Sequence, residues 1–313
     1  MALRRLINSV IGLAVLGLIL LLIIRSDFTV VYQQLKQLSL RMIAILVLLQ
    51  ITSIVAVSFQ WQQVFKMNLL KVPFMTILIM NFYGTFFESI TPAMKTGGEG
   101  FKLIYLKRLN IAYSNSITVL FLQKLLSFSA FVVVLIISLV LAFNRIETAF
   151  LLELILRILF IFAVIAFIGF IIVTYLKKHP KFTHSVENVK NLLRNNPRTL
   201  IFTWVLGIGI WLLYALKIGL ILMFFNVAIT WIEIGYTTYI AYAVGLLPLS
   251  PGGLGTFEAT LTYLFTHANI PYNMALTVTL IFRFFSHWFV FILSGIVIST
   301  QSLIGKRRLK NDL

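Results

Sequence analysis

Long apolar stretches separated by short polar segments run along the whole chain. Six of them have the roughly 20 residues that a helix needs to cross about 30 Å of hydrocarbon. They cover residues 6–24, 42–65, 117–143, 154–176, 200–225 and 273–300. Two more, 73–90 and 234–249, are only marginally long enough, and each runs into a turn rich in proline and glycine. The pattern predicts an all-α polytopic membrane protein with a single transmembrane domain over residues 1–313.

The basic residues distinguish two topologies. If all eight stretches crossed the membrane, the basic loop 177–198 would lie outside the cell, which violates the positive-inside rule. If the two interrupted stretches are instead re-entrant hairpins, six spans remain, and this loop and both termini are cytoplasmic. We therefore predict six full spans plus two re-entrant hairpins that enter from opposite sides.

The two interrupted stretches end in similar sequences. Each has a hydroxyl residue before a proline and then a Gly-Gly-x-Gly run, at residues 91–100 and 250–255. A pair of Gly/Pro-broken segments in matching positions is typical of inverted-repeat transporters with a binding site at the membrane midplane. We therefore predict half-repeats at about 42–143 and 200–300.

The glycine turns are candidate anion sites. Successive backbone N–H groups can face one concavity there, and the positive end of the following helix points at it. An alternative stays open, in which the glycines only permit a tight hairpin and close helix contact.

Ionisable residues inside apolar stretches are the second candidate. Arg283 lies about ten residues into the last span, near the midplane at 1.5 Å per residue. Buried charges at this depth mark a pathway or a pair. We predict that Glu258 approaches Arg283, with Arg283 capturing an anionic head group and Glu258 recognising an ammonium group or coupling protons. A purely structural ion pair is the alternative.

These arguments define a predicted head-group site and two expectations for its surroundings. Lys217 is expected to snorkel towards the outer surface, and the basic piece 101–108 to rest at the inner interface. The predicted lipid-binding residues are Gly97, Gly98, Glu99, Gly100, Lys124, Pro251, Gly252, Gly253, Gly255, Glu258, Arg283 and His287.

Composition supports this picture and excludes other classes. Hydrophobic residues make up 60% of the chain and charged residues 11%, with a mean hydropathy of +1.00. A soluble domain would be about a quarter charged. The net charge is +17, and the basic residues responsible lie mainly at the ends of the spans. We therefore expect contact with anionic lipid and no nucleic-acid partner. The absence of cysteine excludes disulfides and thiolate chemistry, and no catalytic, metal or cofactor motif is found.

The stretch Pro-Gly-Gly-Leu-Gly-Thr-Phe-Glu at 251–258, the earlier glycine run 97–100 and Arg283 together resemble the lysylphosphatidylglycerol synthase transmembrane region family. The resemblance covers essentially the whole chain. It implies a prokaryotic plasma-membrane protein related to the flippase half of bifunctional proteins. Those proteins make an aminoacylated phosphatidylglycerol and move it to the outer leaflet, which protects against cationic antimicrobial peptides.

The chain departs from this family in two places. Members often carry an acidic-Arg-x-x-Asp pattern after the first hairpin, where this chain has Gln-Lys-Leu-Leu-Ser at 123–127. We expect this change to weaken any ion-pair role of Lys124. The soluble synthase domain that follows the last span in the bifunctional relatives is missing, so transferase chemistry is not expected in this chain.

Three functional hypotheses follow. The first is a translocase for an anionic or aminoacylated phospholipid. The second is a membrane component of a phosphatidylglycerol lysyltransferase or of an enzyme for lipid-linked glycans. The third is a non-transporting scaffold for a separate synthase or glycosyltransferase. An oligomer is compatible with each of them.

Overall fold

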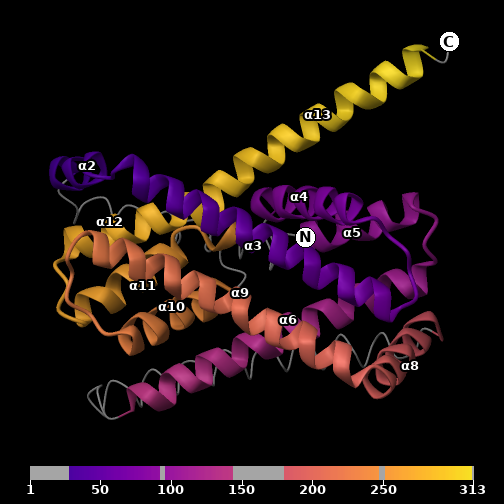
Figure 1. The fold of residues 1–313 in the computed structure, drawn as a ribbon, viewed down its shortest axis with the longest axis horizontal. Helices are drawn as coiled ribbons and strands as arrows, with labels where there is room; N and C mark the ends of the chain where they lie inside the picture. The colour runs from indigo at the N-terminus through magenta and orange to yellow at the C-terminus, as the bar shows by residue number, and fades with distance from the viewer. Residues whose placement is uncertain (1–27, 92–95, 144–179, 247–250, 312–313) are drawn as a thin grey trace, which may run out of the picture.

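The computed structural model describes residues 28–91, 96–143, 180–246 and 251–311 (Figure 1). Within these residues every regular element is a helix. In chain order they are α2 (Phe28–Lys36), α3 (Leu40–Met67), α4 (Phe74–Ile90), α5 (Thr96–Arg108), α6 (Tyr113–Ala142), α8 (Pro180–Asn195), α9 (Pro197–Phe224), α10 (Trp231–Gly245), the short turn η1 (Pro251–Gly253), α11 (Thr256–His267), α12 (Tyr272–Arg283), the π-helical turn η2 (Phe284–Trp288) and α13 (Phe289–Asn311).

In the described part of the chain, four helices are long and apolar enough to cross a membrane. They are α3, α6, α9 and the continuous helix Tyr272–Gln301, which joins α12, η2 and the first part of α13. These helices agree with the predicted spans 42–65, 117–143, 200–225 and 273–300. The predicted spans 6–24 and 154–176 lie outside the described residues.

Two helical hairpins separate the long helices. In one, α4 packs against α5; in the other, α10 packs against α11. The longest of the four, α4, has 17 residues, which is roughly 25 Å at 1.5 Å per residue and less than the hydrocarbon thickness. These lengths favour the predicted re-entrant hairpins.

The order long, short, short, long occurs twice. The first series is α3–α6, and the second is α9–α12 with its continuation into α13. In Figure 1, α3 runs away from α2 towards the side of α8, whereas α9 starts beside α8 and runs back in the opposite direction. The two hairpins lie on opposite sides of the molecule, α4–α5 on the right and α10–α11 on the left. This is the arrangement that an inverted repeat requires.

Charged residues recur at a fixed interval between the two series. Glu258 follows Glu99 by 159 residues, and Arg283 follows Lys124 by the same interval. The starts of α6 and α12 are separated by 159 residues as well. The two halves therefore correspond residue by residue over the second hairpin helix and the long helix after it.

The glycine runs do not follow this register, which corrects the expected match between them. Gly97 and Gly98 lie inside the first turn of α5, whereas Gly252 and Gly253 precede α11 in η1. Only the second run uses left-handed backbone: φ is +59° at Gly252, +70° at Gly253 and +81° at Gly255. Glycine permits close helix contact in the first turn, whereas in the second it also permits the reversal of the backbone.

Candidate functional site

A polar cavity of about 250 Å³ lies between the hairpins and the long helices. Helix α4 contacts η1, so the two hairpins meet at this point. All four long helices contribute to the wall. Apart from Ile54, Val57 and Val290, the lining residues are Gln50, Ser53, Trp61, Asn81, Phe82, Thr85, Glu88, Ser89, Lys102, Gln123, Lys124, Ser127, Tyr214, Tyr242, Gly252, Arg283, Ser286 and His287. A polar chamber inside an apolar helical bundle is where ligand and ion paths are found in membrane proteins.

The second glycine turn needs its glycines for close backbone contact as well as for its dihedral angles. A Cβ on Gly253 would lie 2.9 Å from the carbonyl oxygen of Gly245 at the end of α10. A Cβ on Gly252 would lie 2.7 Å from Cε1 of His287. The turn is therefore pressed between α10 and the last long helix, with Gly252 and His287 at the cavity wall.

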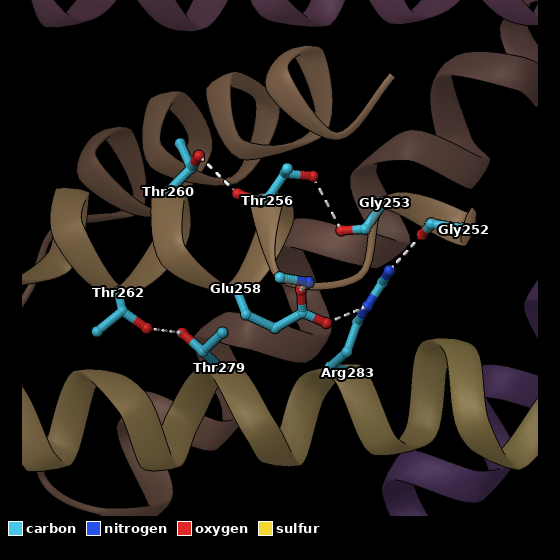
Figure 2. Close-up of polar contacts among 9 residues, drawn as sticks. Gly252, Gly253, Thr256, Glu258, Thr260, Thr262, Thr279 and Arg283 are labelled. Atoms are coloured by element: carbon cyan, nitrogen blue, oxygen red, sulfur yellow. Dashed lines mark hydrogen bonds and ion pairs between the residues drawn. The ribbon is translucent and has the colours of Figure 1, made fainter. Parts of the chain in front are cut away.

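Glu258 and Arg283 form a buried ion pair beside this turn, as predicted (Figure 2). Arg283 Nε donates to Glu258 Oε1 at 2.7 Å, and its Nη2 donates to the carbonyl oxygen of Gly252. Glu258 Oε2 accepts the N–H of Gly255 at 2.7 Å. Both charged side chains are 8% exposed. Glu258 is thus held by two partners, which supports a structural role for it, while Arg283 also lines the cavity.

A second acid–base cluster lies at the first hairpin. Glu99 Oε1 accepts from Lys124 Nζ at 2.9 Å and from Lys102 Nζ at 3.1 Å. The Lys124 side chain is 47% exposed, far more than Arg283 at 8%. Glu99 and Lys124 occupy the positions that Glu258 and Arg283 occupy in the other half. The expectation that the sequence departure at 123–127 weakens an ion pair of Lys124 is therefore wrong, because the carboxylate comes from α5.

Lys102 also departs from expectation. The piece 101–108 was expected at the inner interface, yet Lys102 is only 8% exposed and lines the cavity. Its Nζ donates to Glu99 Oε1. The same Nζ lies 4.6 Å from the ring centre of Trp61, which is a cation–π contact. Lys107 and Arg108, one turn further on, are exposed.

The glycines of the first turn do not line the cavity. Gly98 lies against α4, and Gly97 lies against the side chain of Thr91. Gly100 is exposed, with no neighbour within 4 Å of a built Cβ. Their effect on the site is indirect, through the packing of α4 on α5. In the second half, Pro251 begins η1, and of the glycines in this turn Gly252 lines the cavity whereas Gly253 and Gly255 do not.

Gly98→Ala is expected to destabilise the protein by about 1–3 kcal/mol, because the added methyl group would overpack the hairpin. Its Cβ would lie 2.5 Å from the backbone oxygen of Gly84 in α4. Gly100→Ala in the same helix is the matched control; it should be neutral or stabilising by up to about 1 kcal/mol through helix propensity. The free energy of unfolding of both variants is measured in mixed micelles. Equal losses of stability in the two variants would contradict the close contact between Gly98 and Gly84.

Sequence reasoning missed the polar face of α4. Asn81, Thr85 and Glu88 line the cavity at spacings of four and three residues, which places them on one face of the helix. Polar residues at helical spacing inside the apolar stretch 73–90 were the available signal.

Lys217 was expected to snorkel, and that expectation is wrong. Its side chain is fully buried, and Nζ donates to Gln50 Oε1 at 2.6 Å and lies 4.7 Å from the ring centre of Tyr214. Both partners line the cavity, so Lys217 supports its wall from behind.

A π-helical turn follows Arg283 directly. Residues Phe284–Trp288 adopt this wider turn, and Ser286 and His287 within it line the cavity. Such turns are rare and often occur at functional sites.

The sequence is similar to those of known membrane proteins. The model of a family described as the lysylphosphatidylglycerol synthase TM region matches residues 9–294. A UPF0104 membrane protein of Pyrococcus horikoshii is 23% identical over 290 residues, covering 83% of this chain and 87% of the relative. A UPF0104 membrane protein of Methanocaldococcus jannaschii is 27% identical over 271 residues, covering 77% and 79% respectively.

Proposed function

Since the chain belongs to the lysylphosphatidylglycerol synthase TM region family, we propose that it is a lipid translocase which carries a phospholipid head group through the central cavity between leaflets. The acyl chains would stay in the bilayer while the head group passes between the hairpins. The archaeal relatives support a prokaryotic plasma-membrane location. The distribution of basic residues is our reason to propose that both termini are cytoplasmic.

The observation that carries the proposal is the set of three cations on the cavity wall. Lys102, Lys124 and Arg283 all line the same chamber. Lysine and arginine are the usual partners of phosphate oxygens, and such hydrogen bonds are strong because both groups are charged. Glu99 and Glu258 offset part of this charge from behind the wall. Because their charge is partly neutralised, these cations can bind an anion with an affinity low enough for its release.

The two halves differ in a way that suits alternating access. In the second half, Arg283 is locked by Glu258 and by the carbonyl of Gly252. In the first half, the corresponding Lys124 is about half exposed. Inverted repeats change access by exchanging the conformations of their halves around a fixed site. We propose that the buried pair and the exposed pair exchange their environments in this way, with the re-entrant hairpins reaching the site from opposite leaflets.

A leaflet assay tests the proposal. The full chain would be reconstituted into vesicles that contain a fluorescent phosphatidylglycerol, and a membrane-impermeant quencher would report the outer-leaflet fraction over time. We expect label to exchange between leaflets faster than in protein-free vesicles. Exchange at the protein-free rate would reject transport and leave the enzyme-component and scaffold hypotheses, which co-purification with a synthase would then separate.

A further inference from the structure

One wall of the cavity carries uncharged polar and acidic side chains, all of which can accept hydrogen bonds. Asn81, Thr85 and Glu88 form a polar stripe along α4, and Ser89 extends it. The cations Lys102, Lys124 and Arg283 come from other helices. The stripe and the cations line the same chamber. The chamber therefore offers a head group two chemically different surfaces.

The orientation of the Asn81 amide is fixed by its neighbours. Ser58 Oγ donates its proton to the carbonyl oxygen of Ile54 at 2.9 Å, so this hydroxyl is left as an acceptor. Asn81 Nδ2 donates to Ser58 Oγ at 3.1 Å. The NH2 group of Asn81 must therefore face α3, which leaves Oδ1 on the other side of the amide. Because a hydroxyl that already donates can only accept from Asn81, the reversed amide would lose this bond.

The oxygen of this amide has no partner among the described residues. Asn81 is 8% exposed, it lines the cavity, and its buried Oδ1 accepts no hydrogen bond. A buried acceptor without a donor is destabilising, and native proteins normally supply a donor from protein, water or ligand. Because Asn81 lines the cavity, a head group bound there is a candidate donor for this oxygen.

We propose that the α4 stripe, with Asn81 at its N-terminal end, selects phosphodiester head groups that end in an N–H or O–H donor. This inference rests on the proposed function and names the substrate class of the same cavity. The cations bind the phosphate, and Asn81 Oδ1 accepts from the ammonium or hydroxyl group at the far end. A trimethylammonium head group has no such donor and leaves the acceptor unpaired.

The test is a methylation series at constant net charge. Dissociation constants of short-chain phosphatidylethanolamine, its N-methyl and N,N-dimethyl derivatives and phosphatidylcholine would be measured by calorimetry on the purified full chain. Bulk rises with every methyl group, whereas the last donor is lost only at the final step. We expect affinity to fall about tenfold at that step, from the cost of an unpaired buried acceptor. An even decline along the series would indicate steric exclusion and overturn the inference.

Asn81→Leu is expected to remove the step between the dimethyl and trimethyl lipids, while the affinity for phosphatidylcholine stays within about twofold. Asn115→Leu is the matched control, because Asn115 lies near the start of α6 and does not line the cavity. An unchanged step in Asn81→Leu would reject Asn81 as the selecting residue. Should Asn81→Leu fail to fold, the methylation series on the unaltered chain still decides the donor requirement.

A second arm distinguishes a lipid from a soluble ligand of the same chemistry. Glycerophosphoethanolamine and glycerophosphocholine carry the same head groups without acyl chains. We expect both to bind at least tenfold more weakly than the lipids. Tight binding of the soluble diester with the same donor preference would uphold the selection by Asn81 but contradict lipid translocation. If no head group of either kind binds, both proposals fail.

Discussion

Glu258→Ala is expected to lower the free energy of unfolding by about 3–5 kcal/mol, because it leaves a buried guanidinium without its carboxylate. Arg283 is 7% exposed as a whole residue, so the guanidinium stays largely buried after the partner is lost. The substitution also removes the acceptor of the Gly255 N–H at the start of α11, which adds the cost of a lost helix cap. The measurement is unfolding by denaturing detergent in mixed micelles.

Two further variants show whether this loss comes from the unpaired charge. Glu258→Ala combined with Arg283→Met should be less destabilised than Glu258→Ala alone, since the orphaned cation is gone. Glu187→Ala, at an exposed position on α8, should change stability by less than about 0.5 kcal/mol. If Glu258→Ala unfolds like the unaltered protein, the pair does not join the second hairpin to the last long helix.

Lys124→Met is expected to slow lipid exchange in the leaflet assay by at least tenfold. Hydrogen bonds to charged groups are worth about 1.5–3 kcal/mol, which corresponds to roughly 10- to 150-fold in binding. Folding should be little affected, because Lys124 is about half exposed and Glu99 keeps Lys102 as a partner. The variant therefore separates function from stability, which Arg283 variants cannot do.

Lys107→Met is the matched control for this prediction. Lys107 is an exposed lysine of α5 that does not line the cavity. It changes the net charge by the same amount, so any general effect of charge on vesicle binding appears in both variants. If Lys124→Met and Lys107→Met exchange lipid at the same rate, the cations of the cavity are not part of the path.

The sequence predicted the ion pair Glu258–Arg283 but not the pair Glu99–Lys124, which lies 159 residues earlier in the chain. A carboxylate after a glycine turn and an arginine deep in an apolar span both stand out against their neighbours, and the cost of burying them apart indicates that they meet. The counterpart was missed because local comparison aligned the glycine runs. Only the positions of the helices in space show that the carboxylates and cations are the equivalent residues.

Lys217 and Lys102 show the same limit. Near the end of an apolar stretch, the side chain of a lysine can extend towards water or turn inward to a polar partner. The local sequence pattern is the same in both cases, so it does not distinguish them. Lys217 turns inward because Gln50, 167 residues away in sequence, offers an acceptor at 2.6 Å. Lys102 does so because Glu99 and Trp61 face it.

The sequence by itself determined the membrane class, the four long apolar helices of the described part, the two interrupted hairpins and the meeting of Glu258 with Arg283. These follow from local quantities: the length of an apolar run, the conformational freedom of glycine and the cost of a charge in hydrocarbon. Tertiary structure alone decided which polar side chains share the cavity. Every face of a membrane helix can be apolar, so its sequence does not tell which face meets lipid and which meets another helix.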